Sequence, residues 1–109
     1  IDGLKVAVLG LTTMDTAVKS KYGMEAGVEF RDPVKEASLL VPDLRKKANV
    51  VIAVTHMGHY PNENHGADAP GDVTLARQVN GIDVIVGGHT QLPLFKPDVQ
   101  NNTLILQAY

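Results

Sequence analysis

The sequence predicts an α/β fold with a mostly parallel sheet and flanking helices, and three observations support this. Two apolar runs, Val50–Val54 and Ile82–Val86, lack the polar alternation of a half-exposed strand, which is typical of strands buried on both faces. An earlier apolar run, Leu4–Leu9, is closed by Gly10, and helical patterns separate the three runs. Strands that alternate with helices along a chain favour right-handed crossovers and a parallel sheet.

The main helix is predicted to begin at Pro33. Asp32 can accept hydrogen bonds from the exposed N–H groups at the helix start. Pro33 loses no hydrogen bond at the first helical position, because an N–H there would have no partner within the helix. Pro42 lies inside the helical pattern and is expected to kink or divide it. Apolar residues recur at three- and four-residue steps and form one face of this helix: Val34, Ala37, Val41 and Leu44.

The remaining segments are assigned as loops, one short helix and a last strand. Residues Thr12–Met24 show no periodicity and are predicted to form a surface loop. The irregular stretch Met57–Gly71 is a long loop, and loops of this length in compact domains are usually functional or disordered. Asp72 is expected to cap the short helix that follows. The other expected elements are that helix over Val73–Val79, a loop over Pro93–Asn102 and a strand over Thr103–Gln107.

Length and composition exclude several classes of protein. The chain has 109 residues, a net charge of −2 and no cysteine, so disulfides and thiolate metal sites are excluded. Acidic and basic residues are mixed, which leaves no basic face for a nucleic acid polymer. No apolar run reaches the roughly 18 residues of a membrane span. The sequence opens on a strand without a secretory signal, from which we expect a piece of a longer protein.

Histidines follow two of the predicted strands, with His56 two residues past Val54 and His89 three residues past Val86. Ligands bind beyond the carboxyl ends of strands in open α/β sheets, so neighbouring strands would direct both imidazoles into one crevice. Imidazole nitrogen suits Zn²⁺, Mn²⁺, Fe and Co²⁺, and the amide oxygen of Gln91 suits a hard cation. Two histidines in matching positions favour a metal site. The alternative is that they are ordinary turn residues, solvated or satisfied in the core.

His59 and His65 are weaker candidates. Gly58 lies between His56 and His59 and disfavours the helical turn that two ligands at this spacing would need. Both histidines are better interpreted as polar loop residues or as side chains that contact the metal ligands. The sequence contains no nucleophile elbow, phosphate-binding loop or dinucleotide fingerprint, so no catalytic or cofactor-binding residue is predicted from it.

Three segments carry a family resemblance: Thr55–Tyr60 (THMGHY), His65–Asp72 (HGADAPGD) and Val86–Gln91 (VGGHTQ). Gly3–Thr13 and Phe30–Pro33 look like the same family, so the resemblance covers nearly all of the chain. The sequence closely resembles the 5′-nucleotidase and UDP-sugar hydrolase group of the calcineurin-like metallophosphoesterases. The histidine motifs are the specific part of this resemblance.

The resemblance implies a catalytic domain built as a four-layer α-β-β-α sandwich that holds two divalent metal ions, which could be Mn²⁺, Zn²⁺, Mg²⁺ or Co²⁺. It implies that His56 and His89 ligate one ion and that Gln91 ligates the other. It implies hydrolysis of nucleoside 5′-monophosphates or UDP-sugars by attack of a metal-activated hydroxide on phosphorus. Family members are typically periplasmic or secreted, which gives the expected location.

Other motifs of the family do not occur in this sequence: the D-x-H motif, the G-D motif with the bridging aspartate, and G-N-H-D/E with the catalytic histidine. Residues 1–109 therefore resemble the second half of the catalytic domain. We expect the chain alone to be nearly inactive, and to self-associate or require the rest of its domain, because an apolar sheet face and a sheet edge would stay open. Two alternatives are a non-catalytic metal- or anion-binding module that acts with a partner chain, and a structural half-domain that binds no ion.

Overall fold

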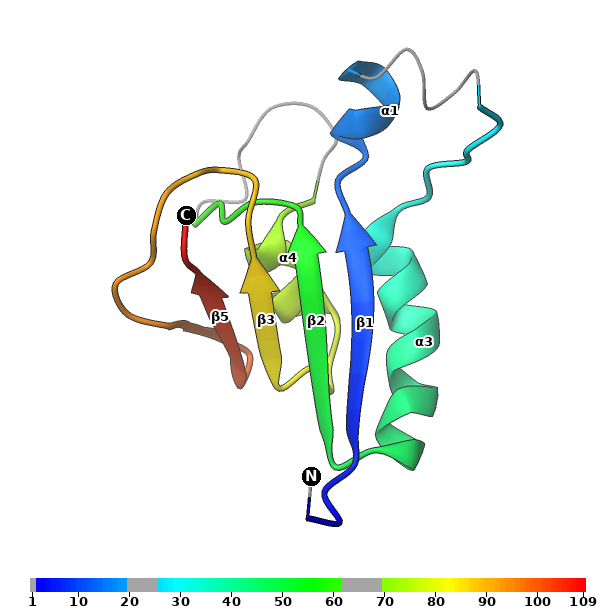
Figure 1. Ribbon diagram of the computed structural model, residues 1–109, viewed down its shortest axis with the longest axis vertical. Coiled ribbons are helices and arrows are strands. Elements are labelled where there is room, and N and C mark those ends of the chain that lie inside the picture. Colours follow the sequence, from blue (N-terminus) through cyan, green and yellow to red (C-terminus); the bar gives the residue numbers. More distant parts are fainter. Residues whose placement is uncertain (1, 20–25, 62–69) are drawn as a thin grey trace.

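The computed structural model describes residues 2–19, 26–61 and 70–109, which form one sheet with helices packed on one face (Figure 1). The strands are β1 (Val6–Thr12), β2 (Val50–His56), β3 (Val84–Gly87), β4 (Asp98–Gln100) and β5 (Thr103–Gln107). The helices are α1 (Asp15–Lys19), α3 (Pro33–Lys47) and α4 (Asp72–Gln78).

The sheet is mostly parallel, which confirms the predicted fold class. Within the described residues it has five strands in the order β1-β2-β3-β5-β4. Strands β1, β2, β3 and β5 are parallel, and β4 pairs with β5 in the antiparallel sense at the edge. Helices α3 and α4 form the crossovers between the first three strands, as the alternation of strands and helices predicts.

The helices cover one face of the sheet and bury the core there. Helix α3 packs on β1 and β2, and α4 packs on β3, β4 and β5. One row of side chains on this face crosses the sheet in register, from Leu9 through Ala53 and Ile85 to Ile105. The buried residues that meet this row come mainly from the two helices: Val34, Ala37, Val41, Val73, Leu75, Ala76 and Val79.

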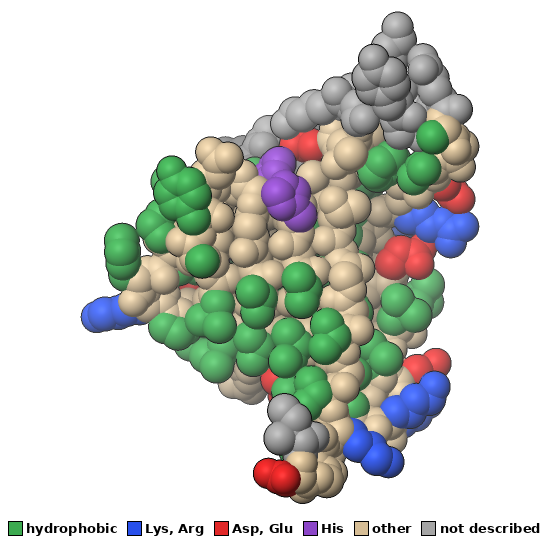
Figure 2. Space-filling view, viewed as in Figure 1, with side chains coloured by type: hydrophobic (Ala, Val, Ile, Leu, Met, Phe, Trp, Pro, Cys, Tyr) green, Lys and Arg blue, Asp and Glu red, His purple; other side chains and the backbone are tan. Residues whose placement is uncertain are grey.

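The opposite face of the sheet is also apolar, but nothing in the described residues covers it. Figure 2 shows this face, with hydrophobic side chains gathered over the strands and histidine side chains beyond the upper end of the patch. We call this surface the open face. Its exposed apolar residues are Val6, Val8, Val54, Val86, Leu104 and Leu106.

Strand β1 ends later along the chain than the sequence predicts, and helix α3 is continuous where a break was expected. Gly10 does not end β1, because it pairs with Val54 and the strand continues to Thr12. Pro42 does not divide α3, which runs unbroken while its buried face packs on the sheet. The predicted cap at Asp32 is confirmed, since its carboxylate accepts from the N–H of Val34 at 2.9 Å and of Lys35 at 3.3 Å.

Two short elements lie in segments that were predicted to be loops. Helix α1 begins at Asp15, whose N–H donates to the Thr13 hydroxyl at 3.1 Å. Strand β4 forms a hairpin with β5 through Asn101 and Asn102, which have φ values of 51° and 61°. A two-residue turn with both φ values positive matches the twist of the paired strands. In the part of the chain that the structure describes, no helix has the length and apolar character needed to cross a membrane.

Candidate metal centre

His56 and His89 lie together at the carboxyl edge of the sheet. His56 is the last residue of β2, and His89 follows the end of its parallel neighbour β3 by two residues. Their ring centroids are 5.0 Å apart and the rings meet edge to face at 74°. His56 is exposed and the His89 side chain is 23% exposed, so neither ring is buried among packed aliphatic side chains. The structure therefore brings the two predicted imidazoles into one accessible place.

The turn that carries His89 has a strained backbone. His89 has a φ of 87° and Gln91 has a φ of 56°, although both have side chains that disfavour the left-handed region. Such residues persist where the surrounding structure fixes them, and they cluster at functional sites. Gln91 is exposed and lies in the same turn as His89, two residues further along.

The segment after β1 approaches the same edge. The N–H of Thr13 donates to the backbone oxygen of His56 at 3.0 Å, which ties the start of α1 to the end of β2. Asp15 Oδ2 lies 4.0 Å from His89 Nε2, which brings a carboxylate to the side of one of the two histidines. The sequence reasoning missed Asp15 because it read this stretch as loop. The pair Thr13 and Asp15 at the end of an apolar run was the available signal.

His59 pairs with a carboxylate of the edge strand β4. His59 Nε2 lies 2.8 Å from Asp98 Oδ2, and because a carboxylate only accepts, Nε2 carries the hydrogen. Burial acts to raise the pKa of Asp98, but hydrogen bonds from His59 and Gln100 and the charges of His59 and Arg77 outweigh it and hold the pKa below its ordinary value. His65, the other weak candidate, lies outside the described residues.

Asp72 does not cap α4, and this prediction is wrong. The capping position belongs to Gly71, and Asp72 is the first helical residue, with its carboxyl group turned into the protein. Its Oδ1 accepts a hydrogen bond of 2.6 Å from the hydroxyl of Thr55. Burial raises the pKa of Asp72 to about 6, against the lowering effects of the Thr55 hydrogen bond and the nearby His59. The buried strand position of Thr55 favours this inward orientation over an exposed cap.

The donors at the centre fit part of a metal site. Two neighbouring imidazoles are suitable ligands for Zn²⁺, Mn²⁺ or Co²⁺, and the amide of Gln91 is close by in sequence. Within residues 2–19, 26–61 and 70–109, no three His, Cys, Asp or Glu side chains form a group that could hold a metal ion. The described residues therefore bring together two nitrogen donors, which alone are too few to hold an ion.

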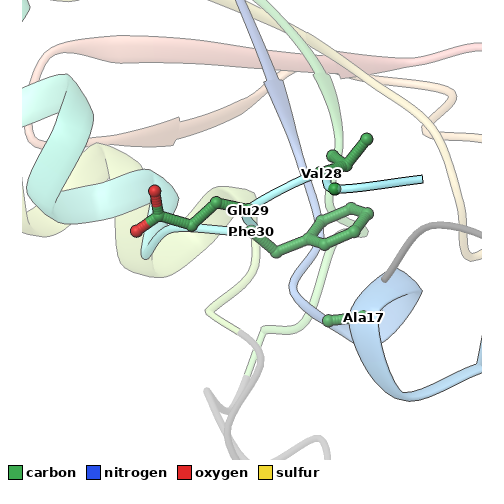
Figure 3. Close-up of a pocket in the computed structure, with 5 residues that line it drawn as sticks. Ala17, Val28, Glu29 and Phe30 are labelled. Carbon is green, nitrogen blue, oxygen red and sulfur yellow. The ribbon is translucent and has the colours of Figure 1, made fainter. Parts of the chain in front are cut away.

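A concave region elsewhere has different chemistry. Ala17 of α1 faces the segment before α3, and Figure 3 shows the ring of Phe30 turned toward it. The lining is largely apolar, with Glu29 directed away from the ring (Figure 3). Its residues are Ala17, Gly27, Val28, Glu29 and Phe30, which offer no histidine and do not extend the metal centre.

Comparisons with known proteins point in one direction. Residues 7–93 match the family described as calcineurin-like phosphoesterase. The chain is 46% identical to a 5′-nucleotidase of Vibrio cholerae, in an alignment that takes in 98% of this chain and 23% of the relative. It is 42% identical to protein UshA of Escherichia coli, with 97% of this chain and 23% of the relative covered. The chain thus spans about a quarter of the length of these relatives.

A solved structure gives the same fold. The calcineurin-like phosphoesterase YfkN of Bacillus subtilis matches with a TM-score of 0.79 at 21% sequence identity. The match covers 95% of this chain and 35% of that chain. At this level of identity the likeness concerns the fold alone, and it supports the arrangement of strands and helices described above.

Proposed function

Because the chain belongs to the calcineurin-like phosphoesterase family, we propose that it forms part of the catalytic domain of a metal-dependent enzyme that hydrolyses nucleoside 5′-monophosphates or UDP-sugars. The single observation that carries the proposal is the meeting of His56 and His89 at the carboxyl edge of the sheet, with ring centroids 5.0 Å apart. Relatives named 5′-nucleotidase support the nucleotide part of the proposal.

His56 and His89 would hold one divalent ion, and Gln91 would contribute to a second. Bound together, two such ions lower the pKa of a water and stabilise the attacking and leaving oxygens of phosphoryl displacement. The chain's own contribution is to hold the ligands in place. The sheet holds His56 in place as the last residue of β2. The turn after β3 holds the backbone of His89 and Gln91 at positive φ values.

The remaining donors would come from protein outside this chain. Two imidazoles and one amide are fewer ligands than two ions require, and carboxylates are the usual bridging groups. Residues 1–109 would therefore be a partial domain that is nearly inactive alone. The groups that recognise the base and sugar would lie elsewhere, and the family resemblance suggests a periplasmic or secreted enzyme.

The test uses the complete polypeptide that the gene encodes, with phosphate release from AMP measured in the presence of Mn²⁺ or Co²⁺. His56→Ala and His89→Ala should each lower Co²⁺ affinity by at least about tenfold and strongly reduce turnover, because each removes a ligand. His59→Gln is the matched control, since His59 pairs with Asp98 and should leave ion affinity near that of the wild type.

Three results would contradict the proposal. Unchanged ion affinity in both His56→Ala and His89→Ala would mean that no ion binds there. Substantial phosphate release by the 109-residue chain alone would mean that the chain carries a complete site. Tight ion binding by the isolated chain, without phosphate release by the complete polypeptide, would instead favour a non-catalytic metal-binding module.

A further inference from the structure

Asp72 lies between the ends of the two strands that lead to the histidines. Its side chain is fully buried, and the Thr55 hydroxyl that donates to it belongs to the residue before His56. Its Oδ2 lies against Gly87, where an added Cβ would overlap the carboxyl oxygen. Gly87 ends β3, two residues before His89. One carboxyl group therefore contacts both strand ends.

The carboxyl group is itself held firmly in place. The N–H of Asp72 donates to the backbone oxygen of Gly58 at 2.8 Å, which fastens the start of α4 to the segment after β2. The preceding Gly71 has no space for a side chain, because an added Cβ would lie 2.7 Å from the same Gly58 oxygen. Asp72 can therefore act as a fixed spacer and not as a mobile side chain.

One of the two carboxyl oxygens of Asp72 is unfavourable for stability at this position. Among the described residues, Asp72 Oδ2 is buried and has no hydrogen-bond partner. A buried polar atom without a partner is unfavourable, so the second oxygen carries a cost that the hydrogen bond from Thr55 does not remove. Local rules of this kind are broken mainly at functional sites.

We propose that Asp72 is a positioning residue that sets the separation of His56 and His89. It acts through Thr55 on β2 and Gly87 on β3, from the helix-covered face of the sheet. Side chains alternate along β2, so Thr55 faces Asp72 while His56 projects on the open face. The inference rests on the proposed function, in which the two histidines bind an ion.

The first test removes the hydrogen bond and keeps the shape of the side chain. In the complete polypeptide with ¹³C-labelled histidine, Thr55→Val should weaken or abolish the NOE cross-peaks between the rings of His56 and His89, without any metal present. Thr103→Val is the matched control. Thr103 is also buried and donates to the oxygen of Ile82 at 2.8 Å, but it lies at the amino ends of the strands.

A second measurement is the affinity for Co²⁺, followed by its absorption spectrum. Thr55→Val should bind Co²⁺ about 10- to 100-fold more weakly, the range found when partners behind metal ligands are removed. Thr103→Val should lower the melting temperature without this loss. Asp72→Ala should repeat the effect of Thr55→Val, and Asp72→Asn should restore the ring contact, because its amide oxygen still accepts from Thr55.

The outcomes separate this inference from the proposed function. If the ring cross-peaks of Thr55→Val equal those of the wild type, Asp72 does not position the histidines. Equal loss of the ring cross-peaks in Thr55→Val and Thr103→Val would also overturn the inference, because the effect would then be general. If the wild-type polypeptide binds no Co²⁺ but Thr55→Val alone loses the ring cross-peaks, the metal site is wrong and the positioning role stands.

Discussion

The two faces of the sheet differ more in their covering than in their composition. The row Leu9, Ala53, Ile85 and Ile105 lies under the helices, and its last three members are completely buried. The next row is displaced by one residue along each strand and lies on the open face. Its apolar members remain 48%, 42% and 36% exposed at Val54, Val86 and Leu106.

The apolar open face accounts for the uninterrupted apolar runs from which the fold was predicted, because it places apolar residues on both sides of each strand. A strand with one solvated face normally alternates apolar and polar residues, whereas a strand covered on both faces does not. Strands β2 and β3 have the second pattern, but within the residues that the structure describes only one of their faces is covered. This pattern is the one expected if a second layer covers the open face, as in the four-layer sandwich that the resemblance implies.

The largest expected effect comes from truncating neighbouring residues on the two faces. Ile85→Ala should lower the free energy of unfolding by about 2–5 kcal/mol, because it leaves a cavity under the helices. Val86→Ala, its matched control on the open face, should change it by less than about 1 kcal/mol. Denaturant unfolding of the 109-residue chain measures both. Similar losses in the two variants would mean that the open face is already covered in solution.

A smaller effect on the free energy of unfolding is expected from the ionisation of Asp72, which is buried on the covered face. The pKa of Asp72 is raised from its ordinary 3.8 to about 6, so the folded chain binds a proton more tightly than the unfolded chain between these values. Wild-type stability should fall as pH rises through this range and stay reduced above it. Asp72→Asn removes the penalty and should be more stable than the wild type at pH 8, by up to about 3 kcal/mol.

The advantage of Asp72→Asn should shrink to near zero at pH 4, where the wild-type carboxyl group is protonated in the folded state. Thermal unfolding at pH 4, 6 and 8 gives the comparison. An advantage that does not depend on pH would show that shape, and not ionisation, decides the stability of this position.

Polar substitutions on the open face are expected to change the free energy of unfolding least. They should, however, clearly reduce self-association. We expect the isolated 109-residue chain to self-associate through this surface. The triple variant Val8→Thr, Val54→Thr and Val86→Thr keeps the β-branched shapes and should reduce association, with each substitution changing stability by about 0.5 kcal/mol or less. Leu39→Gln is the control, since Leu39 is 72% exposed on α3.

Sedimentation velocity over a range of concentrations separates these variants. The wild type and Leu39→Gln should show the same concentration-dependent growth in size, and the triple variant should remain smaller. If the wild-type chain sediments as a monomer at every concentration, the open face is not an association surface.

Regular elements were predicted well where the pattern of burial is strong. The runs in β1, β2, β3 and β5 are apolar enough to identify alone, and Asp32 with Pro33 fixes the start of α3. The meeting of His56 and His89 also followed from sequence, because neighbouring parallel strands end at the same edge. Their role as metal ligands, and that of Gln91, remains a prediction.

The missed features depend on contacts between distant residues. Strand β4 has three residues and exists through its pairing with β5, although the two asparagines of the turn were a local signal. Asp72 looked like a cap because acidic residues are common at helix starts, and only the packing of α4 against Thr55 and Gly87 turns it inward. The pairing of His59 with Asp98 likewise joins residues that are 39 positions apart.

The register of β1 and β2 has one more consequence. Thr12 pairs with His56, in line with the rows of the open face and on the same side of the sheet. A layer packed on the open face would therefore end beside the imidazole of His56. If the proposed function holds, the step that covers this surface would also bring protein against the two histidines, so the core and the ion site would be completed together.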